Sequence, residues 1–298
     1  MTIPDTIHRM PPQPAGLTRW VQGVRASNAA SWLAAVVLIG LPFVAANIVV
    51  QRWMPDAGLR DLRNLLKALV LMLAYVAYVR CWERRPVREL SASGAAGEIG
   101  AGLMLGSLLF SCVVALLFVA GAYSVEAVGT RDVFGSVLAS MAPKVAAGAL
   151  IEEVLFRLVL LRLLVRLLGV VWALVASSLV FGLAHLGNAG ATPLIGVLLG
   201  VELGVLFGAA YLLTRRLWLC AALHFAWNFV QGAVFSIAVS GHTGEAWLRG
   251  TLSGPAWLSG GAFGAEGSVV SVVLCLAAAG VLLTLAHRRG RLDAAASS

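Results

Sequence analysis

Residues 149–157 read A-L-I-E-E-V-L-F-R. This stretch places two adjacent carboxylates, Glu152 and Glu153, inside a long apolar run, and Arg157 follows within two helical turns. A charged side chain at bilayer depth costs about 3 kcal/mol on insertion scales, so such a pair indicates a functional site by default. The alternative is an i, i+4 ion pair between Glu153 and Arg157, which accounts for Glu153 but gives Glu152 no role.

The composition indicates a membrane protein. The chain has 298 residues, of which 60% are hydrophobic and 12% are charged, whereas soluble domains carry about 25% charged residues. The net charge of +8 would suggest a nucleic-acid partner in a soluble protein. Here the basic residues gather in short loops between apolar runs, so we expect no nucleic acid and interpret them as topology signals. The four cysteines form no C-x-x-C pair, which argues against a disulfide framework or a cysteine zinc site.

The apolar runs predict an all-α polytopic membrane bundle of about eight transmembrane helices, because most approach the roughly 20 residues needed to cross the hydrocarbon. The predicted spans are 32–50, 65–82, 99–121, 134–156, 170–186, 193–213, 217–239 and 268–286. The fourth can continue as an amphipathic helix to about residue 168.

Positive charges alternate between the two sides of this bundle. Fifteen of the 22 lysines and arginines fall at 9–25, 80–88, 157–166, 215–216 and 288–291, on one side, and six fall on the other. Because cytoplasmic loops carry the excess of positive charge, we expect both termini in the cytoplasm. Short loops and the lack of targeting segments favour a bacterial inner or plasma membrane.

The spans divide the chain into five parts. Residues 1–31 are expected to form a flexible cytoplasmic tail, 32–133 accessory transmembrane helices, and 134–239 the core that carries the chemistry. Residues 240–267 form an outward-facing loop, interpreted as a linker or as a segment that lies on the membrane through its tryptophans. Residues 268–298 form the last helix and a cytoplasmic tail, which has no C-a-a-X ending.

Further polar groups lie at membrane depth. His185 falls in the fifth predicted span, and His224 and Asn228 lie one turn apart in the seventh, with Gln231 continuing their face. A lone histidine on an apolar helix is more often a hydrogen-bonded core residue than a catalyst. Because buried polar groups must find partners or water, however, acid, imidazole and amide groups on three helices predict one shared, wet cavity.

This set of groups suits hydrolysis. A glutamate in such a cavity can take a proton from water as a general base, and a histidine beside it can orient that water. Imidazole and amide groups on one helix face can donate hydrogen bonds to an oxyanion. No serine or cysteine lies at triad-like spacing, so we favour activated water over a covalent nucleophile. Glu152, His185 and His224 also match a catalytic zinc composition, but no H-E-x-x-H motif supports zinc, and we predict no cofactor.

Three motifs resemble those of a known family. E-E-V-L-F-R at 152–157, F-G-L-A-H at 181–185 and H-F-A-W-N at 224–228 match, in order, the E-E-x-x-x-R, F-x-x-x-H and H-x-x-x-N motifs of the CAAX-prenyl-protease-2-like family. This family includes the Abi and bacteriocin-processing (CPBP) intramembrane endopeptidases. The resemblance covers about residues 134–235 and implies a helix bundle with a conical cavity open to the cytoplasmic leaflet.

The resemblance also implies roles for individual residues. Glu152 and His185 would activate the water, and His224 and Asn228 would stabilise the oxyanion. The supporting residues would be Glu153, Arg157 and Phe181. The family was once described as metalloproteases, and the resemblance implies a glutamate-type hydrolase instead.

The expected substrate is a membrane-associated peptide or protein, processed at a CAAX-type or a bacteriocin- or signal-peptide-type site, with the lipid bilayer as the other partner. The competing classes are a proton-coupled transporter and a non-catalytic immunity or scaffold protein, because buried acids and imidazoles also form proton relays. No inverted repeat or pair of broken helices supports a transporter. Lys144 could serve as a counter-ion in the cavity or snorkel from a helix end, and Glu202 could be structural, a relay or a site neighbour.

Overall fold

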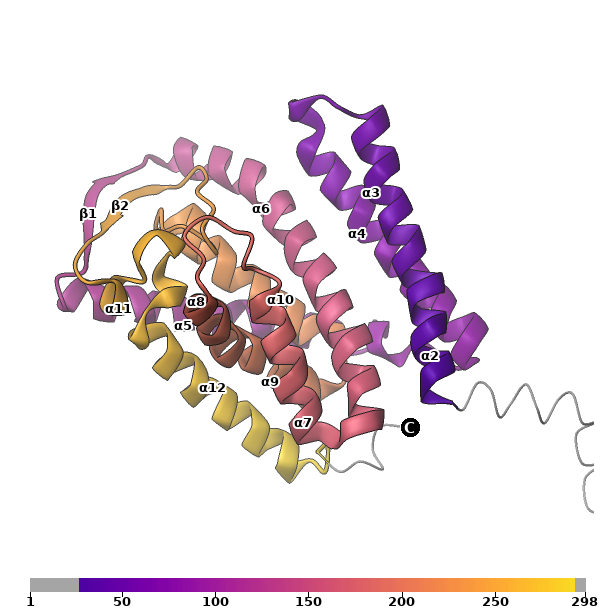
Figure 1. Cartoon of the computed structure of the whole chain (residues 1–298). Helices are drawn as coiled ribbons and strands as arrows, with labels where there is room; N and C mark the ends of the chain where they lie inside the picture. Colours follow the sequence, from indigo (N-terminus) through magenta and orange to yellow (C-terminus); the bar gives the residue numbers. More distant parts are fainter. Residues whose placement is uncertain (1–26, 293–298) are drawn as a thin grey trace, which may run out of the picture.

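The computed structural model describes residues 27–292 (Figure 1). The predicted tails therefore fall largely outside the described residues, at 1–26 and 293–298. The first helix within the described residues begins at Asn28, where Ser27 caps it by accepting a hydrogen bond from the backbone of Ala30. The helical elements are α2 (Asn28–Ala35), α3 (Leu41–Trp53), α4 (Arg60–Ala77), α5 (Ala95–Val119), α6 (Arg131–Glu153), α7 (Arg162–Leu183), α8 (Pro193–Leu199), α9 (Val205–Thr214), α10 (Leu217–Phe229), α11 (Ala256–Ser259) and α12 (Val269–Arg288).

Most of these helices join through π-helical turns into longer rods. Seven stretches within residues 27–292 are long and apolar enough to cross a membrane, which confirms the predicted all-α polytopic bundle. They are Asn28–Trp53, Arg60–Glu83, Ala95–Val119, Arg131–Leu183, Pro193–Thr214, Leu217–Val234 and Val269–Arg288.

The number of stretches differs from the predicted eight at one place. The fourth and fifth predicted spans belong to one stretch of 53 residues, Arg131–Leu183, which bends at Gly169. Gly169 has φ 73° and ψ 172°, a left-handed backbone conformation that interrupts the helical rod and that a residue without Cβ adopts freely. The fourth predicted span therefore continues as a helix to residue 168, as the sequence predicts, and the break follows at Gly169.

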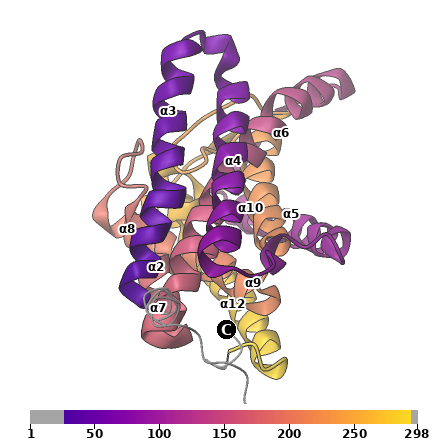
Figure 2. The same cartoon turned by 90° about the vertical axis from the view of Figure 1, so that its right-hand side faces the viewer.

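The helices α3 and α4 form an antiparallel pair on one flank of the bundle, beside α6 (Figures 1 and 2). Helix α10, which is mostly buried, packs against α5, and the two approach closely because α5 presents glycines to its neighbour. A Cβ on Gly106 would lie 2.5 Å from the carbonyl oxygen of Leu223. Small residues allow such backbone approach in membrane bundles, and here they fix the helix that carries His224 and Asn228.

A small β ribbon closes one end of the bundle. Strands β1 (Tyr123–Val128) and β2 (Leu248–Leu252) pair antiparallel, with Tyr123 opposite Leu252 (Figure 1). This pairing joins the segment between α5 and α6 to the segment between α10 and α12, which the charge alternation assigns to the same side. Part of the segment 240–267 is packed against the bundle: Phe263 and Glu266 within it are each 1% exposed.

Candidate active site

A cavity of about 450 Å³ lies between α6, the end of α7 and α10. Its walls include the four residues that the sequence proposes for catalysis: Glu152, His185, His224 and Asn228. On the side of the β ribbon, residues 239–244, here called the cap loop, complete the wall. The structure thus brings together groups that lie up to 76 positions apart in the chain, from Glu152 to Asn228.

The carboxylate of Glu152 stands between the two imidazoles. Its Oε2 atom lies 3.7 Å from Nε2 of His185 and 3.9 Å from Nε2 of His224. This oxygen is buried and has no hydrogen-bond partner among the described residues, although the side chain as a whole is 31% exposed. Both distances are longer than a direct hydrogen bond, and one water can contact the carboxylate and an imidazole nitrogen at this separation.

His185 follows the last turn of α7 and is fixed by its own helix. Its Nδ1 atom lies 2.8 Å from the backbone oxygen of Phe181, one turn earlier. Because a carbonyl oxygen only accepts hydrogen bonds, Nδ1 carries the proton. In the neutral ring, Nε2 is then free to accept a hydrogen bond on the side of Glu152.

His224 is held from the opposite side by the second glutamate of the pair. Its Nδ1 atom donates to Oε1 of Glu153 at 2.8 Å, and Arg157 donates to the same oxygen at 3.0 Å. The side chains of Glu153 and Arg157 are 0% and 2% exposed. The ring of Phe207 stacks on His224 at 4.4 Å between centroids. These contacts fix the plane of the imidazole and aim Nε2 at the cavity.

Arg157 is itself fully surrounded. It donates to the backbone oxygen of Gly204 at 3.2 Å, and its guanidinium lies 4.6 Å from the ring centroid of Phe181. Phe181 is 1% exposed and also packs near both histidines. The i, i+4 pair expected from the sequence is thus part of the framework behind His224, while Glu152 faces the cavity.

Asn228 lies one turn beyond His224 on α10, and its Oδ1 atom is buried without a hydrogen-bond partner in the described part of the chain. Gln231 continues the sequence pattern but does not line the cavity. Its Nε2 atom donates to the backbone oxygen of Ala238, which fixes the turn after α10. The sequence pattern correctly places Gln231 on the polar face of the helix. In the structure its side chain holds the turn that follows α10.

Glu266 is a site residue that the sequence motifs do not indicate. Glu266 lines the cavity and accepts hydrogen bonds from the backbone nitrogen of Ser240 at 2.7 Å and from its Oγ at 2.9 Å. Burial raises the pKa of Glu266 above the ordinary carboxyl value. The one signal for it was a carboxylate among small residues directly before an apolar span.

The two residues of open role are placed differently. Lys144 lines the cavity on α6, two turns before Glu152, and no ion pair is formed by it within the described residues. Glu202 is fully buried outside the cavity wall.

The structure gives limited support to a metal site. Glu152, His185 and His224 converge, but within residues 27–292 no group of three or more His, Cys, Asp or Glu side chains is arranged to hold a metal ion.

Two expectations about the side of the cavity disagree. The resemblance implies a cavity open to the cytoplasmic leaflet. The cavity reaches the cap loop and Glu266, whereas Arg85, Arg162, Arg215 and Arg291 line a separate cavity. The charge alternation assigns the arginine end to the cytoplasm and the cap loop to the outside.

Comparison with known proteins shows similarity to a known family over part of the chain. Residues 134–230 match the family model described as Rce1-like, type II CAAX prenyl endopeptidase Rce1-like. The matched segment is about one third of the chain and contains all four candidate catalytic residues. No curated protein and no solved structure matches the chain. The family match confirms the resemblance predicted from the three motifs, and it supports a CAAX-type intramembrane endopeptidase within a multi-pass membrane bundle.

Proposed function

We propose that this protein is a glutamate-type intramembrane endopeptidase that cleaves a peptide bond with activated water. The observation that carries the proposal is the position of Glu152, whose Oε2 atom lies within 3.9 Å of Nε2 of both His185 and His224 in a cavity of about 450 Å³. A carboxylate and an imidazole acceptor on one water supply the two functions that a hydrolytic base needs: orientation and proton removal.

The first step is attack by water. Glu152 takes a proton from the water while Nε2 of His185 accepts a hydrogen bond from the other O–H. The water oxygen bonds to the carbonyl carbon, and the carbonyl π electrons move to oxygen. The oxyanion then re-forms the C=O bond, the C–N bond breaks, and the proton held by Glu152 passes to the nitrogen of the departing amine. Atoms and charge balance without a covalent enzyme intermediate or a redox partner.

The oxyanion formed in this step requires donors. Asn228 can donate from its side-chain amide. His224 can donate from Nε2 only when the ring is protonated, because its Nδ1 proton is directed to Glu153. The Glu153 carboxylate then faces the added positive charge, so the buried ion pair behind His224 acts as a positioning element for the oxyanion site.

The substrate is a peptide or protein that reaches the site from the membrane, such as a CAAX-type protein or the precursor of a bacteriocin or signal peptide. The motif resemblance and the match to a CAAX endopeptidase family support this class. Metal is not required in this mechanism, and dialysis against a chelator should leave turnover unchanged. If turnover is lost and only zinc restores it, the attacking water is bound to a metal ion rather than held by Glu152.

The test compares the membrane peptidomes of cells that express the wild type, Glu152→Gln or Glu245→Gln at equal protein levels. Glu245 is exposed and lies outside the cavity wall, so Glu245→Gln is the matched control. New termini with the wild type and the control, but not with Glu152→Gln, are expected. If termini persist with Glu152→Gln, the proposed base is wrong. If no variant changes the peptidome but Glu152→Gln abolishes proton flux in proteoliposomes, the chain is a relay.

A further inference from the structure

A second cavity, of about 430 Å³, lies away from the active site. It forms where the loop after the Arg60–Glu83 span, the middle of the 53-residue stretch, the turn between α9 and α10, and the end of α12 meet. Four chain segments that leave or enter apolar spans thus converge, so the cavity is at the level where a bilayer meets water. We call it the arginine cavity.

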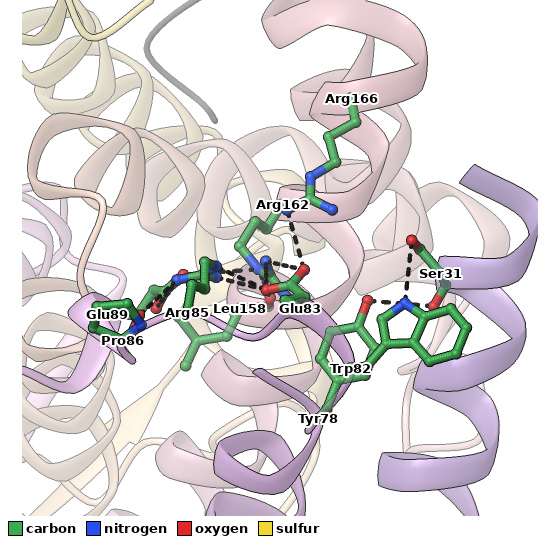
Figure 3. Close-up of polar contacts among 10 residues, drawn as sticks. All are labelled: Ser31, Tyr78, Trp82, Glu83, Arg85, Pro86, Glu89, Leu158, Arg162 and Arg166. Carbon is green, nitrogen blue, oxygen red and sulfur yellow. Dashed lines mark hydrogen bonds and ion pairs between the residues drawn. The ribbon is translucent and has the colours of Figure 1, made fainter. Parts of the chain in front are cut away.

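Seven arginines line this cavity, and glutamates balance only part of their charge. Glu83 binds Arg162 at 2.7 Å and Arg166 at 3.0 Å (Figure 3). Glu89 binds Arg85 at 2.5 Å in the same view.

A third carboxylate, Glu98, lies 3.4 Å from Arg216. The other three arginines of the wall, Arg88, Arg215 and Arg291, form no ion pair within residues 27–292. Seven guanidinium groups against three carboxylates leave an excess of four positive charges around one hollow.

Hydrogen-bond donors in the wall also lack partners. Arg162 is 6% exposed, yet its Nη2 atom is buried with no acceptor in the described chain. The Nε atoms of Arg215 and Arg216 are likewise buried with no acceptor in the described chain. A buried charged donor without an acceptor is costly, and an anion in the cavity would offer these guanidinium groups an acceptor that the described chain does not supply. The planar guanidinium fork matches the geometry of phosphate oxygens.

We propose that the arginine cavity binds a phosphate-bearing anion at the membrane surface. The sources with this chemistry are the headgroup of an anionic phospholipid and free phosphate. Basic pockets between transmembrane helices recognise lipid headgroups in this way. The bound anion would join the ends of four spans, and it would therefore stabilise the folded bundle without contacting the catalytic groups.

The test measures the thermal unfolding midpoint of the full chain in neutral maltoside micelles, through the fluorescence of its nine tryptophans. The protein is titrated separately with phosphatidylglycerol, phosphatidylcholine and inorganic phosphate at constant ionic strength. A ligand that binds only the native state raises the midpoint. The test variant is Arg88→Gln/Arg215→Gln, which breaks no ion pair among the described residues. Its control is Arg131→Gln/Arg249→Gln, which removes the same charge from two exposed positions outside the cavity.

We expect phosphatidylglycerol, and not phosphatidylcholine, to raise the midpoint of the wild type and the control. The test variant should bind roughly tenfold or more weakly, because charge-assisted hydrogen bonds are lost. A rise with inorganic phosphate that equals the lipid's would identify the free anion as the source. No rise with either anion, or an equal rise in the test variant, would overturn the site. If the double variant does not fold, Arg88→Gln alone, at an exposed residue, gives the same reading at smaller amplitude.

Discussion

His224 and Arg157 donate to the same oxygen atom, Oε1 of Glu153, at 2.8 Å and 3.0 Å. The second oxygen of this carboxylate is buried and has no partner in the described structure. One atom therefore couples the imidazole to the ion pair that the sequence suggests. The two glutamates of the motif are thereby distinguished: Glu153 faces into the framework, and Glu152 faces the cavity.

Glu152→Gln should abolish turnover while the protein stays folded. The amide keeps the shape of the side chain but cannot take a proton from water, and general bases contribute about 10²–10⁴-fold to rate. The measurement is cleavage of a membrane peptide in liposomes, with the thermal unfolding midpoint as the folding check. Retained turnover at an unchanged midpoint would exclude Glu152 as the base.

Arg157→Met should destabilise the fold rather than only slow the reaction. It leaves the Glu153 carboxylate buried without its cation, and breaking a buried pair in this way costs about 3–5 kcal/mol. Glu153→Gln/Arg157→Met removes both charges and should recover part of that loss in unfolding experiments. If the loss of stability in the double variant equals the sum of the losses in Glu153→Gln and Arg157→Met measured separately, the two side chains are not coupled.

Glu266→Gln should change the dependence of stability on pH. The folded protein holds the pKa of Glu266 above its unfolded value of about 4.5. Between these two values the unfolded chain binds fewer protons, so the wild type loses stability as pH rises through this window. The variant lacks this contribution, and its unfolding midpoint should fall less steeply over the same window. Glu245→Gln, at an exposed position, should follow the wild type; a Glu266→Gln curve parallel to the wild type would contradict the assignment.

Gly106→Ala should destabilise the contact between α5 and α10. The new Cβ would lie 2.5 Å from the oxygen of Leu223, and overpacking of this kind costs about 1–3 kcal/mol. Gly100→Ala on the same helix meets nothing within 4 Å and should be neutral or stabilising, because alanine has the higher helix propensity. Equal effects of the two changes on the unfolding midpoint would show that the close approach is not required.

The side on which the cavity lies can be measured directly. In a chain with Cys81 and Cys112 changed to alanine, Thr243→Cys reports on the cap loop, and Arg88→Cys on the arginine cavity. The charge alternation predicts that an impermeant thiol reagent labels Thr243→Cys from outside intact cells and Arg88→Cys only after lysis. The opposite pattern would place the site at the cytoplasmic face, as the family resemblance implies.

Much of the bundle could be predicted from the sequence, because apolar runs and charged loops follow directly from the cost of burying charge in lipid. The start of α8 at Pro193 and the helical stretch that runs from Arg131 to the bend at Gly169 agree with it. The bend at Gly169 was harder to interpret. A short run with a single glycine does not reveal whether two helices are separate spans or arms of one stretch.

The candidate catalytic groups were accessible from the sequence for a related reason: Glu152, His185 and His224 are polar where lipid is expected. Glu266 and the cap loop were not, because polar residues in a glycine-rich segment look like an ordinary surface loop. Their place in the cavity wall depends on contacts such as the hydrogen bonds from Ser240 to Glu266, which lies 26 residues further along the chain. Local sequence patterns do not predict contacts between residues so far apart in the chain.

The order of these parts along the chain has a consequence for biosynthesis. A nascent chain that has left the ribosome as far as residue 235 carries all four candidate catalytic side chains. It lacks the cap loop, Glu266, strand β2 and the last membrane helix. The wall of the cavity is completed only when residues 239–266 have been added. The proposed site therefore closes well after its catalytic side chains have been made, and nascent chains that stop before residue 239 are without a closed site.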